Sequence, residues 1–132
     1  FARTLRPIEE QEARVFETGV VAWMAAMLAG FGVDLIMLEM MSDPALANPA
    51  IDAAKSTGLP VWVGYSCRGN GKGEPVSWTI ESLSIEDMVR QISPDRGDVA
   101  GVMHTSVSLV SASIKAVRKL LTRLLYRIQN FR

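Results

Sequence analysis

Short apolar runs alternate along this chain with longer stretches that mix apolar and polar residues. Residues 33–38 are apolar except for Asp34, and residues 60–65 and 99–103 form similar runs bounded by glycine, proline or aspartate. Runs this short are typical of parallel strands that are covered on both faces of a sheet. We therefore predict strands over residues 33–39, 60–66 and 98–104.

The stretches between these runs carry signals for helices. Asp43 followed by Pro44 is typical of an N-terminal cap and a first helical turn. Ser84 with Asp87 three residues later resembles a capping box. Pro49 lies inside the second stretch, at a position where proline kinks or splits a helix. We predict four helices, over residues 9–29, 43–56, 84–92 and 106–130.

Helices and strands alternate in the predicted order α-β-α-β-α-β-α. This alternation indicates an α/β fold in which parallel strands are joined by right-handed helical crossovers. A length of 132 residues indicates a single domain over residues 1–132, with a modest core.

Residues 68–76 are polar and rich in glycine, which predicts a loop. Lys72 stands among the glycines at 69, 71 and 73, an arrangement that superficially resembles a phosphate-binding loop. The spacing matches neither the P-loop nor the dinucleotide-binding fingerprint, and no helix signal follows directly. We expect a flexible loop on the substrate side of the sheet.

Charge is unevenly distributed, although the formal net charge is zero. Residues 1–98 contain 14 acids and 8 bases, a net charge of −6, whereas residues 99–132 contain 6 bases and no acids. The last predicted helix, residues 106–130, is therefore long and basic. It is also amphipathic, with an apolar stripe that repeats every three or four residues: Ile114, Val117, Leu121, Leu124, Ile128 and Phe131.

This basic helix has three alternative partners. It packs on its own sheet or on a second copy of the chain, it lies on an anionic membrane surface, or it contacts nucleic acid. We expect the first, because no aromatic platform or known nucleic-acid-binding module accompanies the basic residues. The first helix offers a complementary acidic surface through Glu9, Glu10, Glu12 and Glu17.

Cys67 is the single cysteine, so a disulfide within the chain and a cysteine-rich structural zinc site are excluded. We expect a reducing, cytoplasmic location. The longest apolar stretch, residues 19–33, is broken by Gly30 and Gly32 and leads directly into a strand pattern. We therefore predict a buried helix there and not a membrane span.

The candidate chemistry lies where the predicted strands end. Glu39 ends the first strand, Ser66 and Cys67 end the second, and His104 ends the third. Ligands of α/β proteins bind at the carboxyl ends of parallel strands, so we expect Glu39, Ser66 and His104 to face a common opening. His104 is also a candidate metal ligand or base. The structural alternatives are a helix cap for Glu39, a loop hydrogen bond for His104 and a packed thiol for Cys67.

Three segments carry a resemblance to a known family. GVDLIMLEMMSD (residues 32–43), GLPVWVGYSCR (58–68) and DVAGVMHTSV (98–107) resemble the middle of the homocysteine S-methyltransferase family. The resemblance covers roughly residues 15–118 and rests on the order, the spacing and the Leu-Glu-Met ending. It implies a (β/α)8 barrel, of which this chain would supply strands four, five and six.

The resemblance also implies a chemistry. Family members transfer a methyl group to the thiol of homocysteine, which is activated by a zinc ion held by three cysteines. A glutamate similar in position to Glu39 holds the amino group of homocysteine. The Gly-Gly-Cys-Cys zinc motif is missing here, and Met103 and His104 stand where the family has an Asn-Cys pair. The sequence after Arg118 departs from the family pattern and resembles that of a truncated or frame-shifted gene product.

Two functions follow as expectations. The first is a homocysteine S-methyltransferase-like protein that is inactive as an isolated chain, with no catalytic residue assigned and no zinc bound, but with an amino-acid site at Glu39, Ser66 and His104. The alternative is a non-catalytic, self-assembling α/β module whose sheet edges or terminal helices form a homo-oligomer. Neither function calls for nucleic acid or a membrane as a partner.

Overall fold

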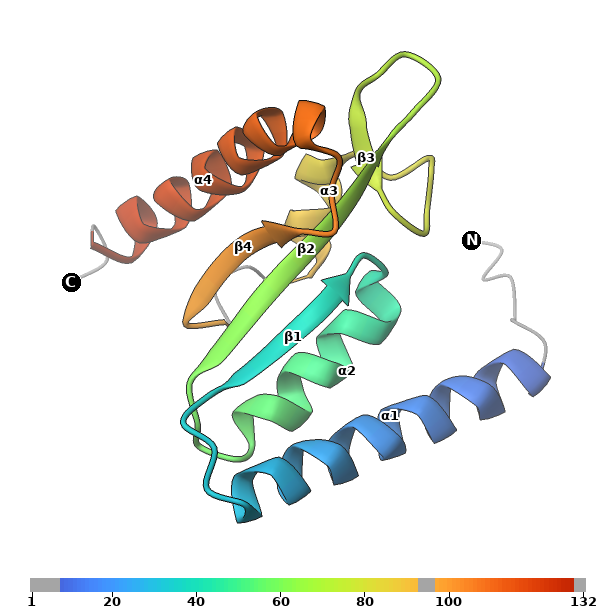
Figure 1. The fold of residues 1–132 in the computed structure, drawn as a ribbon, viewed down its shortest axis with the longest axis vertical. Coiled ribbons are helices and arrows are strands. Elements are labelled where there is room, and N and C mark those ends of the chain that lie inside the picture. Colours follow the sequence, from blue (N-terminus) through green and yellow to red (C-terminus); the bar gives the residue numbers. More distant parts are fainter. Residues whose placement is uncertain (1–7, 93–96, 130–132) are drawn as a thin grey trace.

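The protein is an α/β structure in which helices lie against one face of an open sheet (Figure 1). The computed structural model describes the backbone of residues 8–92 and 97–129 and the side chains of residues 19–92 and 97–121. In chain order, the elements formed by these residues are α1 (Ile8–Gly30), β1 (Ile36–Met41), α2 (Pro44–Lys55), β2 (Val61–Gly69), β3 (Pro75–Ser77), α3 (Ile85–Gln91), β4 (Val99–Met103) and α4 (Val107–Gln129).

Three strands run parallel in the spatial order β1-β2-β4, as predicted from the apolar runs. Met37 pairs with Trp62 and Trp62 pairs with Val99, so these three residues lie side by side at one level of the sheet. The fourth strand, β3, was not predicted. It pairs antiparallel with the far end of β2, so the prediction of a loop over residues 68–76 is wrong at both of its ends.

The glycine-rich segment is the turn of this hairpin. The Asn70 side-chain oxygen accepts hydrogen bonds from the backbone N–H groups of Lys72 and Glu74, each at 2.9 Å. Gly73 has a φ of 76°, which a residue with a side chain adopts only under strain. Side-chain capping and this glycine therefore shape the turn, and the hairpin projects beyond the carboxyl end of the parallel strands (Figure 1).

The helices pack on one face of the parallel strands. Right-handed crossovers that add successive strands in one direction keep every connecting helix on the same side of the sheet. Contacts join α2 to β1 and β2, and α4 to β2 and β4. At the flanks, α1 packs on α2 and α3 packs on α4, so α1 and α4 lie at opposite ends of the helical layer (Figure 1).

The hydrophobic core fills the space between this sheet face and the helices. Alternate residues of β2, namely Val61, Val63 and Tyr65, are buried there. They pack with buried side chains from the neighbouring elements: Ile36, Leu38, Ala47, Ala50, Ile51, Ala54, Met88, Val89, Ala116, Val117 and Leu120.

The opposite face of the sheet is uncovered by any described element, which corrects the prediction of strands covered on both faces. Met37, Trp62 and Val99 point to this face and are 45%, 38% and 45% exposed. Buried and exposed positions alternate from Ile36 to Glu39 in β1 and from Val61 to Val63 in β2, which is the pattern of a sheet with one solvated face, whereas residues 63–67 of β2 are all buried.

The sheet is open and its strands are not all parallel, so the structure is α/β without being a closed barrel. Strand limits differ from the prediction mainly in β1, which begins at Ile36 and continues past Glu39 to Met41. The helix caps agree with the sequence: the Asp43 side chain accepts from the Ala45 N–H at 2.8 Å, and the Ser84 hydroxyl accepts from the Asp87 N–H at 3.2 Å. Helix α2 continues through Pro49 without a break.

The first helix is less buried than predicted. The apolar stretch over residues 19–33, which we expected to be buried, leaves Trp23 in α1 62% exposed and Phe31, directly after α1, 78% exposed. Within the described residues, no helix combines the length and apolar character needed to span a bilayer. Several side chains on which the predicted charge and apolar patterns depend lie outside the described residues: Glu9, Glu10, Glu12, Glu17, Leu124, Ile128 and Phe131.

Candidate functional site

Glu39 and His104 meet at the carboxyl edge of the parallel strands, although they are 65 residues apart in sequence. The Glu39 Oε2 atom lies 3.4 Å from His104 Nε2. Their side chains are 58% and 52% exposed, so an approaching ligand reaches both. The two residues belong to β1 and to the end of β4, which lie on either side of β2, and their side chains converge across that central strand.

A β-bulge directs the Glu39 side chain. Leu38 pairs with Val63 and Met41 pairs with Tyr65, so β1 has one residue more than β2 between these pairs. An extra residue of this kind bends a strand and changes the direction of the side chains within it. The sequence pattern predicted that Glu39 ends this strand. Glu39 lies instead inside β1, which continues to Met41.

Two residues at this edge have left-handed backbone conformations. Met40 has a φ of 60° and His104 has a φ of 48°. A residue with a side chain pays about 1–2 kcal/mol for this conformation. Such residues persist only where the surroundings hold them, and they are concentrated at functional sites. Both occur within one residue of the Glu39–His104 contact.

Hydroxyl groups brace the turn after Glu39. The Ser42 hydroxyl donates to the carbonyl oxygen of Met40 at 3.3 Å and lies 2.7 Å from the Thr79 hydroxyl. The buried Ser77 hydroxyl donates to the Ser42 carbonyl oxygen at 2.6 Å and accepts from the backbone N–H of Thr79. These hydrogen bonds join the segment that follows β1 to the segment at the end of β3.

Thr105 braces the turn at His104 in a similar way. Its hydroxyl donates to the carbonyl oxygen of Met103 at 2.9 Å and accepts from the backbone N–H of Cys67 at 3.1 Å. The left-handed residue is therefore fixed to the neighbouring strand β2 by the residue that follows it. Each of the two strained positions has its own hydroxyl support.

Ser66 is buried at the same edge, and its hydroxyl has no hydrogen-bond partner among the described residues. By strand alternation, it points to the uncovered face, where its register partner is Met103. The Met103 side chain extends over Gly64, since a Cβ added at Gly64 would overlap its Sδ and Cε atoms. A buried hydroxyl without a partner costs about 1–3 kcal/mol.

Cys67 is fully buried on the helix-covered side of β2. Burial raises the pKa of its thiol, and the neighbouring hydroxyls of Ser113 and Thr105 offset part of that increase. A protonated, enclosed thiol is neither an effective nucleophile nor a ready metal ligand. These observations agree with the packed-thiol alternative for Cys67.

The residues at this edge do not fit the zinc centre implied by the family resemblance. Among the described residues, no cluster of three or more histidine, cysteine, aspartate or glutamate side chains is arranged to hold a metal. Glu39 and His104 offer two ligands, whereas zinc in proteins takes four, of which at least three come from side chains. The geometry suits a polar organic ligand better than zinc.

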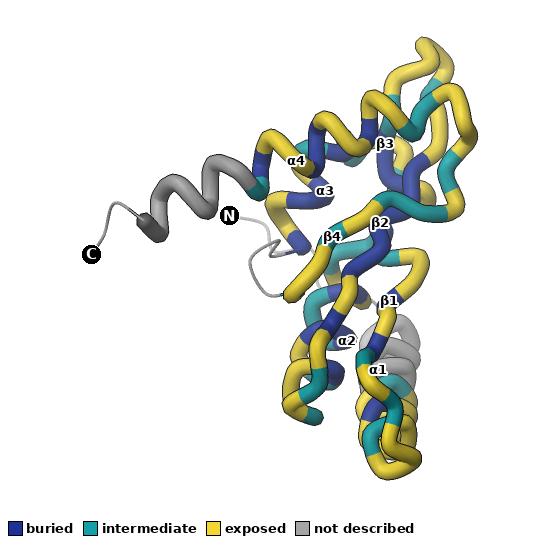
Figure 2. The backbone as a smooth tube through the Cα atoms, turned by 60° about the vertical axis from the view of Figure 1, so that its left-hand side comes forward, coloured by how far each residue is buried: buried dark blue, intermediate teal, exposed yellow. Residues whose placement is uncertain are grey.

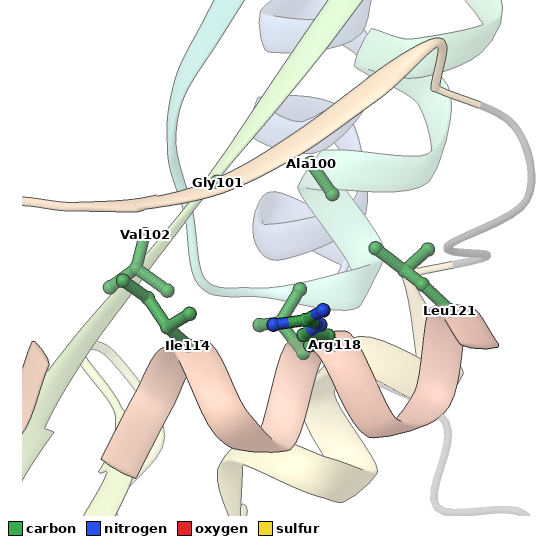
Figure 3. A pocket seen from close by; sticks show the side chains of 7 residues that line it. Ala100, Gly101, Val102, Ile114, Arg118 and Leu121 are labelled. Atoms are coloured by element: carbon green, nitrogen blue, oxygen red, sulfur yellow. The ribbon is translucent and has the colours of Figure 1, made fainter. Parts of the chain in front are cut away.

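A groove of about 360 Å³ lies elsewhere, between the outer edge of β4 and helix α4 (Figure 3). It is lined by Ala100, Gly101, Val102, Ile114, Val117, Arg118 and Leu121. Because Ala100 and Val102 pack toward the helices, the groove opens on the opposite side of the strand from Met103. The groove is therefore separate from the Glu39–His104 site.

Of the three residues that we singled out at the strand ends, the structure brings Glu39 and His104 into contact, and Ser66 lies on the strand between them, in register with Met103. Sequence reasoning missed the supporting hydroxyls of Ser42, Ser77, Thr79 and Thr105. The signal that could have found the first and the last is the short hydroxyl-containing segment that directly follows Met41 and His104.

Comparisons with protein-family models, with curated proteins and with solved structures gave no match to this chain. The resemblance to homocysteine S-methyltransferases therefore remains a prediction from the quoted segments.

Proposed function

We propose that this chain is a homocysteine S-methyltransferase-like protein that binds an amino-acid thiol at the carboxyl edge of its parallel strands. The observation that supports it most is the 3.4 Å contact between Glu39 and His104 beside two left-handed residues. As an isolated chain it does not transfer methyl groups, because the residues at this edge cannot complete a zinc centre.

The sheet supports a relation to barrel enzymes. A doubly wound sheet has helices on both faces, whereas the sheet of a (β/α)8 barrel has helices on its outer face alone. Here the strand order β1-β2-β4 follows the chain, and the helices lie on one face. In a barrel, Met37, Trp62 and Val99 would face the interior.

Each site residue has a role in this proposal. The Glu39 carboxylate accepts charge-assisted hydrogen bonds from the ligand ammonium group. The imidazole of His104, beside it, presents a second polar group at the same opening. The Ser66 hydroxyl donates to the ligand carboxylate when Met103, an unbranched side chain with several rotamers, moves away from Gly64.

Calorimetric titration with L-homocysteine tests the proposal. We expect weak binding, with a Kd of about 1 mM, and about tenfold weaker binding by the Glu39→Gln variant, which loses the charge-assisted interaction. Glu86→Gln, on helix α3 away from the site, is the matched control and should bind like the unchanged protein. 4-Mercaptobutyrate, which lacks the amino group, should not bind. Equal binding by the Glu39→Gln and unchanged proteins would contradict the proposal.

A separate titration with zinc addresses the metal. We expect no stoichiometric zinc binding by the reduced protein. One tightly bound zinc ion per chain would show that the metal ligands had been misassigned. The homocysteine titration would still test separately whether Glu39 binds the amino group.

The second candidate function, a self-assembling module without catalysis, is favoured by the free edges of the sheet. Strand β1 pairs with β2 alone and β4 pairs with β2 alone within the described residues. Unpaired strand edges attract further strands. A chain that assembles without binding homocysteine would support this second function over the first.

A further inference from the structure

We propose that a second copy of this chain completes the sheet. The free edge of β4 in each copy pairs with the free edge of β1 in the other, about a two-fold axis parallel to the strands. Two half-cylinders of three parallel strands then enclose one interior, with the helices of both copies outside. This inference concerns assembly and stands independently of the amino-acid site.

Backbone N–H groups at the free edges of β1 and β4 point outward and can form hydrogen bonds with a further strand. The N–H of Ile36 donates to the Pro60 carbonyl oxygen and the N–H of Asp98 donates to the Val61 carbonyl oxygen. Residues of a parallel strand direct their backbone groups alternately to the two neighbouring strands. The N–H groups of Met37 in β1 and of Val99 and Gly101 in β4 therefore point away from β2, toward the unpaired edges.

The uncovered face is layered in a way that suits a narrow interior. Met37, Trp62 and Val99 form a row of large apolar side chains at one level. The next level contains the register pair Gly64 and Gly101. The Met103 side chain extends over Gly64, whereas a Cβ added at Gly101 would meet nothing within 4 Å. Alternating levels of large and small residues allow side chains from opposite walls of a small barrel to interdigitate.

The two ends of the helical layer offer matching surfaces. At one end, the groove between β4 and α4 leaves Ile114 48% exposed (Figure 3). At the other end, much of the described part of α1 is exposed (Figure 2), and its sequence places large apolar residues there at helical spacing. These residues are Val20, Trp23, Met24, Met27 and Leu28, with Phe31 directly after the helix. Pairing β4 with β1 of the partner brings α1 of the partner toward α4, so each surface covers the other.

Charge favours a second copy over an unrelated apolar partner. Residues 99–132, which include β4 and α4, carry six bases and no acid, whereas residues 8–41, which run from α1 through β1, carry six acids and one base. The proposed pairing joins the basic end of one copy to the acidic end of the other at both contacts. Opposite charges across an interface favour this orientation over pairing two identical ends.

The mass of the intact chain in solution, measured by light scattering and sedimentation at micromolar concentration, tests the assembly. We expect twice the mass of one chain. Trp62→Lys, which would bury an unpaired charge in the shared interior, should raise the dimer dissociation constant about 100-fold or more. Leu46→Lys introduces the same charge at an equally exposed apolar site on α2 and should leave the dimer intact.

A pair of edge variants tests which strands meet. Met37→Pro removes the N–H group of Met37 that points outward from β1. Gly101→Pro removes one of the two outward N–H groups named in β4. Neither substitution removes a hydrogen bond to β2. Each variant alone should be a monomer, with a circular dichroism spectrum like that of the dissociated unchanged chain. An equimolar mixture should recover a dimer with one intact β4–β1 contact.

Several outcomes would overturn the inference. A single-chain mass for the unchanged protein, or a ladder of larger masses, would rule out a closed pair. A dimer that survives Met37→Pro would indicate pairing of identical edges or a different surface. If Pro variants lose their folded spectrum, Met37→Lys and Val99→Lys serve in their place, and failure of both Lys variants to weaken the dimer also contradicts the assignment.

Discussion

The two faces of the central sheet are built from the same strands but differ in what surrounds them. On the helix-covered face, alternate residues of β2 from Val61 to Cys67 are almost completely buried. On the other face, Trp62 is partly exposed, the Met103 side chain lies over Gly64, and Ser66 is buried. Stability therefore comes mainly from the first face, and the polar groups at the edge of the second face remain available for binding.

The difference shows that burial alone does not identify the core. Ser66 and Ser77 are both fully buried, yet Ser77 makes hydrogen bonds and Ser66 has no partner. A buried hydroxyl that is satisfied contributes to the fold, whereas one without a partner costs free energy unless a ligand or a partner chain supplies the missing bond. Four predictions sharpen this contrast.

The largest expected effect lies on the covered face. Ile51→Ala removes a fully buried side chain from α2 and should lower the free energy of unfolding by about 3 kcal/mol. Leu46→Ala, on the exposed side of the same helix, should lower it by less than about 1 kcal/mol. Urea denaturation of both variants gives the two values. Similar losses for both would mean that α2 is covered on both sides.

The two buried serines should respond in opposite directions to the same substitution. Ser66→Ala removes an unpartnered hydroxyl and should leave the free energy of unfolding unchanged or raise it by about 1 kcal/mol. Ser77→Ala breaks bonds to the Ser42 carbonyl oxygen and to two backbone N–H groups, and should lower it by about 2 kcal/mol. Equal losses in both variants would show that Ser66 has a protein partner in solution.

The strain at His104 should be measurable by comparing two substitutions. Both His104→Ala and His104→Gly remove the imidazole, but only glycine relieves the left-handed conformation at a φ of 48°. The glycine variant should therefore be more stable than the alanine variant by about 1 kcal/mol. Thermal denaturation compares them. Equal stability would remove the argument that this position is strained in order to hold a functional side chain.

The smallest effect is expected at the amino-terminal end of the parallel strands, where Asp98 joins β4 to β2. Its carboxylate accepts from the Val61 N–H at 2.7 Å and contacts Lys55 Nζ at 3.1 Å. The Val61 N–H, with a further contribution from Lys55, lowers the pKa of Asp98. A lowered folded-state pKa contributes stability above the unfolded-state pKa, and that contribution is lost as the pH falls through the folded-state value.

Asp98→Asn should therefore be slightly less stable than the unchanged protein at pH 7, and the gap should close as the pH falls below about 4. Denaturation curves recorded from pH 7 to pH 2 would measure this convergence. Because the carboxylate is exposed, solvent screening keeps the difference small. A gap that widens in acid would mean that folding raises the pKa of Asp98 and does not lower it.

Much of the local structure could be predicted from the sequence because its signals are local. Asp43 and Ser84 cap helices as predicted, because a short polar side chain can reach the free N–H groups of the next turn. The three apolar runs form neighbouring parallel strands in chain order. The hairpin with β3 was missed because its outer strand is only three residues long and begins with proline.

The candidate site was only partly predictable. Glu39, Ser66 and His104 could be chosen because they stand near the ends of apolar runs. The bulge that turns Glu39 toward His104 could not, because it depends on the pairing of Met41 with Tyr65 and not on a local signal. The same holds for the support of Met40, which passes through Ser42 to Thr79, 37 residues away.

The sequence by itself determined the α/β class, the parallel strands and the residues that reach the edge of the sheet, because hydrophobic periodicity and helix caps act over a few residues. Within the described residues, tertiary structure alone decided that one face of the sheet is uncovered, that Glu39 contacts His104 and that Ser66 lacks a partner. These properties arise from packing between segments that are distant in the chain, and no short stretch of sequence encodes them.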